Sequence, residues 1–246
     1  QLSWHGINLS ELIREHGTPL KFSYLPKISE NIQRAKDWFA AAFEKHQYKA
    51  QYNYCYCTKS SHFSHVLNEV LKNETHIETS SAFDINIVES LYEKGMLTKY
   101  NYIICNGFKR AQYVENITRI INMGFSNCIP IIDNYEELQL LSEGVNGTMN
   151  VGIRIASEEE PKFEFYTSRL GIGYKNILKY YKNEIAQSEK VNLKMLHFFI
   201  NTGIRDNAYY WNELTKCLKV YVDLKKICPT LDSLNIGGGF PIKNSL

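Results

Sequence analysis

Several features that would assign a protein to a broad class are absent from this chain of 246 residues. It has no run of about 18 apolar residues, the length that a membrane helix needs. Its first residues show no basic region followed by an apolar run, so no signal peptide is visible. Lys plus Arg total 28 and Asp plus Glu total 26, so the charge balance indicates neither a nucleic-acid nor an acidic-membrane partner. We therefore expect a cytoplasmic protein without a nucleic-acid or membrane partner.

The cysteines match neither a metal site nor a disulfide framework. Cys55 and Cys57 are spaced as CxC, and no pair of Cys or His follows at zinc spacing. Together with Cys105 and Cys128 they lie in apolar segments that are typical of strands. Buried free thiols fit this pattern better than disulfides. Because no pair of Cys or His stands at zinc spacing, we also expect no metal.

The chain alternates between short apolar runs and longer amphipathic stretches. The apolar runs predict strands at 52–57, 76–80, 102–105, 128–132, 150–155, 195–200 and 233–236. The amphipathic stretches predict helices at 28–45, 61–71, 84–94, 110–123, 135–141 and 208–227. Hydrophobic residues make up 44% of the chain, enough to bury a sizeable core around these elements. Sustained βα alternation predicts a parallel sheet with right-handed crossovers.

Two α/β architectures satisfy this alternation, a doubly wound sheet and a (β/α)₈ barrel. A doubly wound nucleotide fold would show a glycine-rich turn after its first strand, but the residues there are Thr58-Lys59-Ser60-Ser61. This favours the TIM-type barrel, incomplete here with about seven βα units. We expect a leading segment at 1–27 and a barrel at 28–246 that stops before its eighth strand.

Lys59 follows the first predicted strand, at the end where barrels place their active sites. Alternation would put Cys55, Cys57 and Lys59 on one face. A lysine that points inward over the barrel mouth and is partly desolvated becomes a usable amine for Schiff-base chemistry. A solvated lysine that opens a loop is the alternative.

Three further polar residues stand in apolar strands. Glu78 is a carboxylate in the second strand, and a buried carboxylate needs a cation or hydrogen-bond donors. Arg154 is its natural partner, in a functional site or in a purely structural pair. His197 shares a face with Phe199 and Asn201, where the two rings could pack on a flat ligand, or the histidine could be a satisfied core residue.

The most specific short run is Gly237-Gly238-Gly239, which directly follows the last predicted strand. Glycines at that place leave backbone N–H groups open and permit the close approach of a phosphate. A flexible turn is the alternative, and we expect a phosphate site.

These segments occur in one order along the chain, and together they resemble a known family. The chain resembles the pyridoxal-phosphate decarboxylases of basic amino acids with an alanine-racemase-like barrel, which include the arginine, diaminopimelate and ornithine decarboxylases. The resemblance extends from about Gly17 to Pro241. Its segments are Tyr56-Cys57-Thr58-Lys59, then Glu78 with Ser80-Ser81 and Asp84, then Ser168-Arg169-Leu170-Gly171-Ile172, then the His197 strand and Gly237-Gly238-Gly239-Phe240-Pro241. The run Ile104-Cys105-Asn106-Gly107-Phe108-Lys109 is most similar to the biosynthetic arginine decarboxylase branch.

The resemblance implies roles for these residues. Lys59 would hold pyridoxal phosphate covalently, and Gly237, Gly238 and Gly239 would bind its phosphate. Thr202 stands where the family has a phosphate-binding serine. Glu78 and Arg154 match positions that support the cofactor site. The resemblance also implies a small amino-acid substrate and, in a full-length form, a homodimer or higher oligomer.

Two departures from the family pattern stand out. The family reads His-Phe-His-Ile-Gly-Ser at the sixth strand, whereas this chain has His197-Phe198-Phe199-Ile200-Asn201-Thr202. Phe199 therefore replaces the histidine that stacks on the cofactor, and a phenyl ring can stack but cannot titrate. The family chain also continues past the glycines with an eighth strand and a β-rich domain, so we expect this chain to be the first part of a longer protein, inactive alone.

The leading prediction is decarboxylation of a basic amino acid, arginine to agmatine in polyamine synthesis. Diaminopimelate and carboxynorspermidine are alternative substrates. A non-catalytic relative that binds the cofactor or a partner, a small cofactor-carrier barrel and a plain nucleotide-binding protein are the alternatives from other classes.

Overall fold

A computed structural model describes residues 2–157, 170–200 and 207–240. The chain forms two compact units, residues 1–50 and 51–246. The first contains β1 (Ser3–Trp4), β2 (Ile7–Asn8), α1 (Leu9–His16) and α2 (Pro26–Lys45). Asn8 begins α1, because its side-chain oxygen accepts hydrogen bonds from the backbone N–H groups of Ser10 and Glu11. The domain boundary expected at residue 27 remains a prediction.

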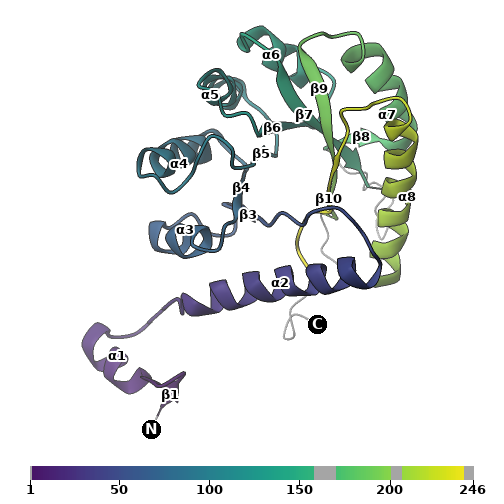
Figure 1. Cartoon of the computed structure of the whole chain (residues 1–246). Helices are drawn as coiled ribbons and strands as arrows, with labels where there is room; N and C mark the ends of the chain where they lie inside the picture. Colours follow the sequence, from purple (N-terminus) through teal and green to yellow (C-terminus); the bar gives the residue numbers. More distant parts are fainter. Residues whose placement is uncertain (1, 158–169, 201–206, 241–246) are drawn as a thin grey trace, which may run out of the picture. The chain divides into compact units, whose positions relative to one another are not determined.

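The second unit is built on one curled sheet (Figure 1). Its strands run in the order β10-β9-β7-β6-β5-β4-β3, and a short β8 pairs with β7. Every neighbouring pair in this sheet is parallel. The strands are β3 (Cys55–Cys57), β4 (His76–Thr79), β5 (Ile103–Cys105), β6 (Cys128–Ile132), β7 (Met149–Ala156), β8 (Ile172–Gly173), β9 (Val191–Phe198) and β10 (Ser233–Asn235).

Helices cover the convex face of this sheet (Figure 1). They are α3 (Ser64–Leu71), α4 (Ala82–Glu93), α5 (Ala111–Asn122), α6 (Glu137–Gly144), α7 (Tyr174–Tyr180) with the π-helical turn η1 (Tyr181–Ile185), and α8 (Asn207–Lys225). The arrangement confirms the predicted α/β fold, a partial TIM-type barrel of parallel strands with helices outside. All seven predicted strands are present; β6 has the predicted ends, and the others differ from their predicted ends by a few residues. Helices α1 and α7 and the short strands β1, β2 and β8 were not predicted.

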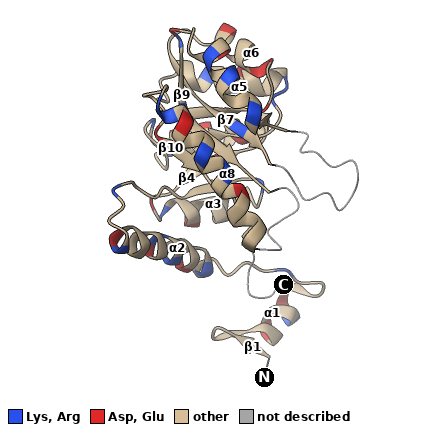
Figure 2. Cartoon of the chain, turned by 90° about the vertical axis from the view of Figure 1, so that its right-hand side faces the viewer, with Lys and Arg blue, Asp and Glu red and all other residues tan. Residues whose placement is uncertain are grey.

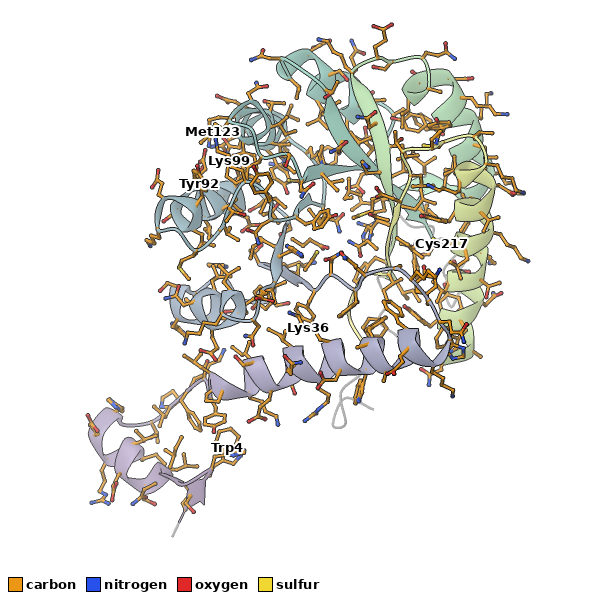
Figure 3. The ribbon with its side chains drawn as sticks, in the orientation of Figure 1. Trp4, Lys36, Tyr92, Lys99, Met123 and Cys217 are labelled. Carbon is orange, nitrogen blue, oxygen red and sulfur yellow. The ribbon has the colours of Figure 1, made fainter. Side chains whose placement is uncertain are left out.

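The main core lies between the sheet and the helices. Each helix buries one apolar stripe, as α5 does with Ile117 and Ile120. One charged side chain, Lys99, contacts the carboxyl-terminal parts of two helices at the edge of this layer. Lys99 lies over the ring of Tyr92, with its Nζ 5.7 Å from the ring centroid, and its ammonium donates a hydrogen bond to the Met123 carbonyl (Figure 3).

A second and smaller apolar cluster occupies the concave face of the sheet. It consists of Ile104, Ile129, Ile131 and Met195. Gly152 makes this packing possible, since a Cβ atom there would lie 2.5 Å from Ile131 Cδ1. The cluster forms the floor of the barrel interior, as stacked layers of inward side chains do in such barrels.

The surface carries both signs of charge. Figure 2 marks the positions of Lys and Arg and those of Asp and Glu mixed along the ribbon of the helices, in keeping with a formal net charge of +2. In the described residues, no helix is long and apolar enough to cross a membrane.

Candidate functional site at the carboxyl ends of the strands

Polar residues follow the apolar floor two positions further along the strands. Asn106 comes two residues after Ile104, and His197 two residues after Met195. Because side chains alternate along a strand, residues two apart share a face. The concave face therefore changes from apolar to polar at the carboxyl ends of the strands, where barrel enzymes place their sites. The inward polar residues are Glu78, Asn106, Asp133, Arg154, His197 and Asn235.

Lys59 stands just after β3, at the same end of the sheet. It is exposed and lies in a turn in which the Ser60 N–H donates to the Cys57 carbonyl at 3.0 Å. The strand ends at Cys57, so the alternation does not extend to Lys59, and the exposed side chain matches the alternative of a solvated lysine that opens a loop rather than an inward, partly desolvated one. Lys59 instead lines a depression of about 370 Å³ together with Ser80, Ser81, Phe83 and Asp84.

The thiols before Lys59 do not compete with it as nucleophiles. Burial raises the pKa of Cys55 to about 12, with a smaller contribution from the charge of Glu78. Burial also raises the pKa of Cys57. Both thiols therefore stay protonated at neutral pH, and a thiol is a far weaker nucleophile than a thiolate.

Glu78 is held by two amides, one after the neighbouring strand β5 and one in the distant strand β10. Its Oε1 accepts from Asn106 Nδ2 at 3.2 Å, and its Oε2 accepts from Asn235 Nδ2 at 3.3 Å. The strands β4 and β10 are separated by four others in the sheet order. Only a strongly curled sheet lets their side chains meet, so the hydrogen bond from Asn235 to Glu78 crosses the barrel interior. Asn106 and Asn235 are site residues that the sequence analysis missed; their inward register, two positions after a strand's inward residue, could have revealed them.

His197 is enclosed at the centre of this group. It is 1% exposed, and its Nε2 lies 3.1 Å from Asn106 Nδ2. Burial lowers the pKa of His197, and the charge of Glu78 opposes this shift while that of Arg154 adds to it. The imidazole is therefore neutral at physiological pH, and the structure brings the predicted residues Glu78, Arg154 and His197 together.

This histidine is expected to make the chain sensitive to acid. Below about pH 6.5 an unfolded histidine binds a proton that the folded, buried ring rejects. The unfolded state then binds more protons, so the free energy of unfolding rises with pH in that window and falls on acidification. We expect the free energy of unfolding of His197→Gln to change less between about pH 5.5 and about pH 7.5 than that of the parent chain, as measured by urea unfolding. An equal change in the variant and the parent chain would show that burial does not alter the titration of the ring.

Arg154 and Asp133 form a second buried pair. Arg154 Nε lies 4.0 Å from Asp133 Oδ1, and both side chains are buried. Burial raises the pKa of Asp133, against the lowering effects of Lys109 and Arg154. No hydrogen bond reaches either carboxylate oxygen of Asp133 from the described residues. Glu78 was the partner expected for Arg154, but the ion pair that the structure gives is with Asp133.

Asn134 holds the turn before α6, since its Oδ1 accepts hydrogen bonds from the backbone N–H groups of Glu136 and Glu137. Asp133 has the register of the inward residues of β6, so its side chain belongs to the site.

A buried ion pair fixes the loops around this carboxylate. Lys109 Nζ donates to Glu137 Oε2 at 3.1 Å and to the carbonyls of Gly107 and Ile131. Glu137 in turn accepts from the backbone N–H groups of Lys109 and Asp133. The loops after β5 and β6 are thereby joined.

The glycine run forms a turn directly after β10. Gly237 and Gly239 have φ of +71° and +76°. A Cβ atom on Gly237 would lie 2.7 Å from the Phe198 carbonyl oxygen, whereas one on Gly238 would meet nothing within 4 Å. The backbone N–H groups of Gly238 and Gly239 find no acceptor within the described ranges. A turn with free N–H groups and open space beside it fits a phosphate.

Phe199 packs beside this turn. Its ring is 3.2 Å from the position of a Cβ on Gly237, and Arg154 Cζ lies 5.8 Å from the ring centroid. The side chain is half-buried, so part of a flat apolar surface faces the site. Thr202 and Asn201, together with Ser168, Arg169 and Pro241, lie outside the described residues.

Comparisons with known proteins identify the family to which the chain is similar. Residues 27–245 match the family described as "Pyridoxal-dependent decarboxylase, pyridoxal binding domain". A biosynthetic arginine decarboxylase of Prochlorococcus marinus (strain MIT 9215) is 26% identical over 242 residues, which cover 93% of this chain and 36% of the relative. The chain therefore spans about a third of the length of the curated relatives that it matches.

Solved structures share the fold. Diaminopimelate decarboxylase from M. jannaschii with L-lysine superposes with a TM-score of 0.81 at 21% identity, covering 96% of this chain and 54% of that one. The biosynthetic arginine decarboxylase of Campylobacter jejuni gives a TM-score of 0.73 at 20% identity, covering 96% of this chain and 40% of that one.

Within the described residues, no group of His, Cys, Asp and Glu could hold a metal ion.

Proposed function

The chain belongs to the pyridoxal-dependent decarboxylases through their pyridoxal-binding domain, and we propose that it serves in the decarboxylation of a basic amino acid, with arginine as the substrate and agmatine as the product. The observation that carries the proposal is one juxtaposition. An exposed lysine after β3 and a glycine turn after β10 stand at the same end of one curled sheet, with a phenyl ring beside the turn.

The residues fit the cofactor that the family implies. Lys59 would attach pyridoxal phosphate through its amine, and Gly238 and Gly239 would donate backbone N–H groups to the phosphate. Phe199 would pack against the flat pyridine ring, as aromatic rings do in offset stacks. When bound, pyridoxal phosphate supplies an electron sink for the electron pair left by departing carbon dioxide.

The remaining residues hold the site in shape. Glu78 accepts two amide hydrogen bonds and stays where both strands hold it. His197 is a neutral ring that orients without carrying charge, and Arg154 keeps a positive charge near Phe199. Water is excluded below the site by the apolar floor of Ile104, Ile129, Ile131 and Met195.

The choice of arginine rests on the similarity to biosynthetic arginine decarboxylases, one of which is 26% identical to this chain over 242 residues. Diaminopimelate remains an alternative, since the solved structure with the TM-score of 0.81 is a diaminopimelate decarboxylase; carboxynorspermidine is a further one. Polyamine synthesis, a homodimer or higher oligomer of the full-length form, and a cytoplasmic location are parts of the same proposal.

Removal of the lysine tests the proposal. Lys59→Ala is expected to abolish covalent attachment of pyridoxal phosphate, seen as loss of the visible absorbance band, without unfolding the chain, because the side chain is exposed. The matched control is Lys72→Ala, which alters an exposed lysine in the surface pair with Glu69 and is expected to bind the cofactor normally. A band that persists in Lys59→Ala would show that another amine holds the cofactor.

A non-catalytic relative is the second candidate, because Phe199 lacks the polar function of the histidine that the family has there. It predicts attachment of the cofactor at Lys59 without release of carbon dioxide from any basic amino acid. Measuring labelled carbon dioxide from arginine, lysine and diaminopimelate on a chain extended past Leu246 separates the two candidates, and Phe199→His restores activity only if the missing ring nitrogen is the cause.

A further inference from the structure

A hydrogen-bonded group of four side chains crosses the concave face of the sheet. It joins Glu78 of β4, Asn106 after β5, His197 of β9 and Asn235 of β10. We infer that Asn106 is a positioning residue. Its amide holds His197 as the neutral tautomer with the proton on Nδ1, and the same amide fixes Glu78. The importance of this tautomer for catalysis rests on the proposed function, but the tautomer itself is a property of the chain without cofactor.

The orientation of the Asn106 amide follows from its neighbours. Its Oδ1 accepts a hydrogen bond from the Gly107 backbone N–H at 2.9 Å, so the oxygen is committed to that side. Its Nδ2 group therefore faces Glu78 and His197. An ionised carboxylate can only accept, so one Nδ2 hydrogen is donated to Glu78 Oε1.

The tautomer of His197 follows from the second Nδ2 hydrogen. The amide nitrogen has no acceptor function, so it can only donate to His197 Nε2 across their 3.1 Å contact. Nε2 must then carry a lone pair, and the proton of the neutral ring lies on Nδ1. A histidine's protonated nitrogen is set by what its other nitrogen contacts.

The other edge of the ring faces β10. No hydrogen bond of good geometry reaches Nδ1 from the described residues. Asn235 is the residue paired with His197 in the register of β9 and β10, and it lies close enough to favour a protonated ring. A proton on Nδ1 suits that neighbour, whereas a lone pair there would leave Nε2–H facing the Asn106 amide hydrogens.

Asn235 extends the group to the glycine turn. Its Nδ2 donates to Glu78, and its Oδ1 accepts from the Gly237 N–H at 2.9 Å. One carboxylate thus connects the amide that orients the imidazole with the amide that orients the turn. If the site binds pyridoxal phosphate, this group fixes the imidazole relative to the phosphate turn before the cofactor arrives.

Nitrogen NMR on the full chain without cofactor tests the inference. Two-bond ¹H–¹⁵N correlations of ¹⁵N-labelled histidine distinguish a protonated from an unprotonated ring nitrogen. The signals of His197, one of seven histidines, are identified by their loss in His197→Gln. We expect Nδ1 to be protonated and Nε2 to be unprotonated at neutral pH.

Two variants of Asn106 test its role. Asn106→Asp replaces the donor with an oxygen acceptor, so we expect the proton to move to Nε2. Asn106→Leu removes the donor, so we expect the preference for Nδ1 to be lost. The control is Asn127→Asp near the amino end of β6, whose amide donates to the Tyr100 carbonyl, and it should leave His197 unchanged.

Two results would overturn the inference. One is a His197 ring that is charged or protonated on Nε2 in the unsubstituted chain, which decides the matter even if both variants fail to fold. The other is an unchanged Nδ1 tautomer in a folded Asn106→Asp. A chain that fails to bind pyridoxal phosphate would instead contradict the proposed function and leave the tautomer result intact.

Discussion

Gly237→Ala is expected to destabilise the chain by about 2 kcal/mol or more, which is the cost of forcing a residue with a Cβ into a left-handed conformation. The φ of Gly237 is +71°, and the new Cβ would lie 2.7 Å from the Phe198 carbonyl oxygen. Backbone atoms cannot move aside as the end of a flexible side chain can. The turn after β10 should therefore change shape, and pyridoxal phosphate binding should weaken with it. Urea unfolding and a fluorescence titration with the cofactor measure the two effects.

The next residue provides the matched comparison. A Cβ on Gly238 would meet nothing within 4 Å and needs no unusual φ. Gly238→Ala should change stability by about 0.5 kcal/mol at most, as for an ordinary surface substitution. Gly238→Val should still weaken phosphate binding, because its side chain fills the open space beside the turn. Equal stability of the Gly237 and Gly238 variants would contradict the geometry of the turn, and unchanged affinity in Gly238→Val would contradict the phosphate site.

Lys109→Met is expected to cost about 3–5 kcal/mol, because it leaves a buried carboxylate without its cation. The Lys109 and Glu137 side chains are 0% and 2% exposed, and the lysine also satisfies two backbone carbonyls. For a chain of this length such a loss lowers Tm by roughly 10 °C. Because the pair joins the loops after β5 and β6, the region around Asp133 should loosen first.

The control for this change is a surface ion pair of similar geometry. Lys72 lies 2.8 Å from Glu69 but is 69% exposed. Exposed pairs contribute roughly 0–1 kcal/mol, so Lys72→Met should unfold almost as the parent chain does. Thermal unfolding followed by circular dichroism compares the two. A Lys109→Met chain as stable as Lys72→Met would mean that the Lys109–Glu137 pair is solvated.

The pattern of strands and helices was predictable because burial on both faces leaves a strong signal in parallel strands. The strand Cys128–Ile132 was predicted with its observed ends, and every residue in it is buried. Elements whose apolar pattern is short left no such signal, as with the two residues of β8. The short helix α7 was missed as well.

The site was predictable in its members more than in its contacts. Glu78, Arg154 and His197 stood out as lone polar residues in apolar strands, and the charges of Glu78 and Arg154 do lie near the His197 ring. The partners of these residues depend on how far the sheet curls. Sequence spacing does not indicate that a residue of β4 can reach Asn235, 157 positions away. The alternating pattern alone could not decide between an inward Lys59 and a solvated one, because the strand ends at Cys57, two residues before the lysine.

Attachment of pyridoxal phosphate to Lys59 is tested by borohydride reduction of the unsubstituted chain mixed with the cofactor, followed by peptide mapping. We expect one pyridoxyl group, on Lys59, in a chain that remains folded. An adduct spread over several exposed lysines, or placed on one distant from the glycine turn, would contradict this expectation. The same measurement on a chain extended past Leu246 would show whether further residues are needed to hold the cofactor.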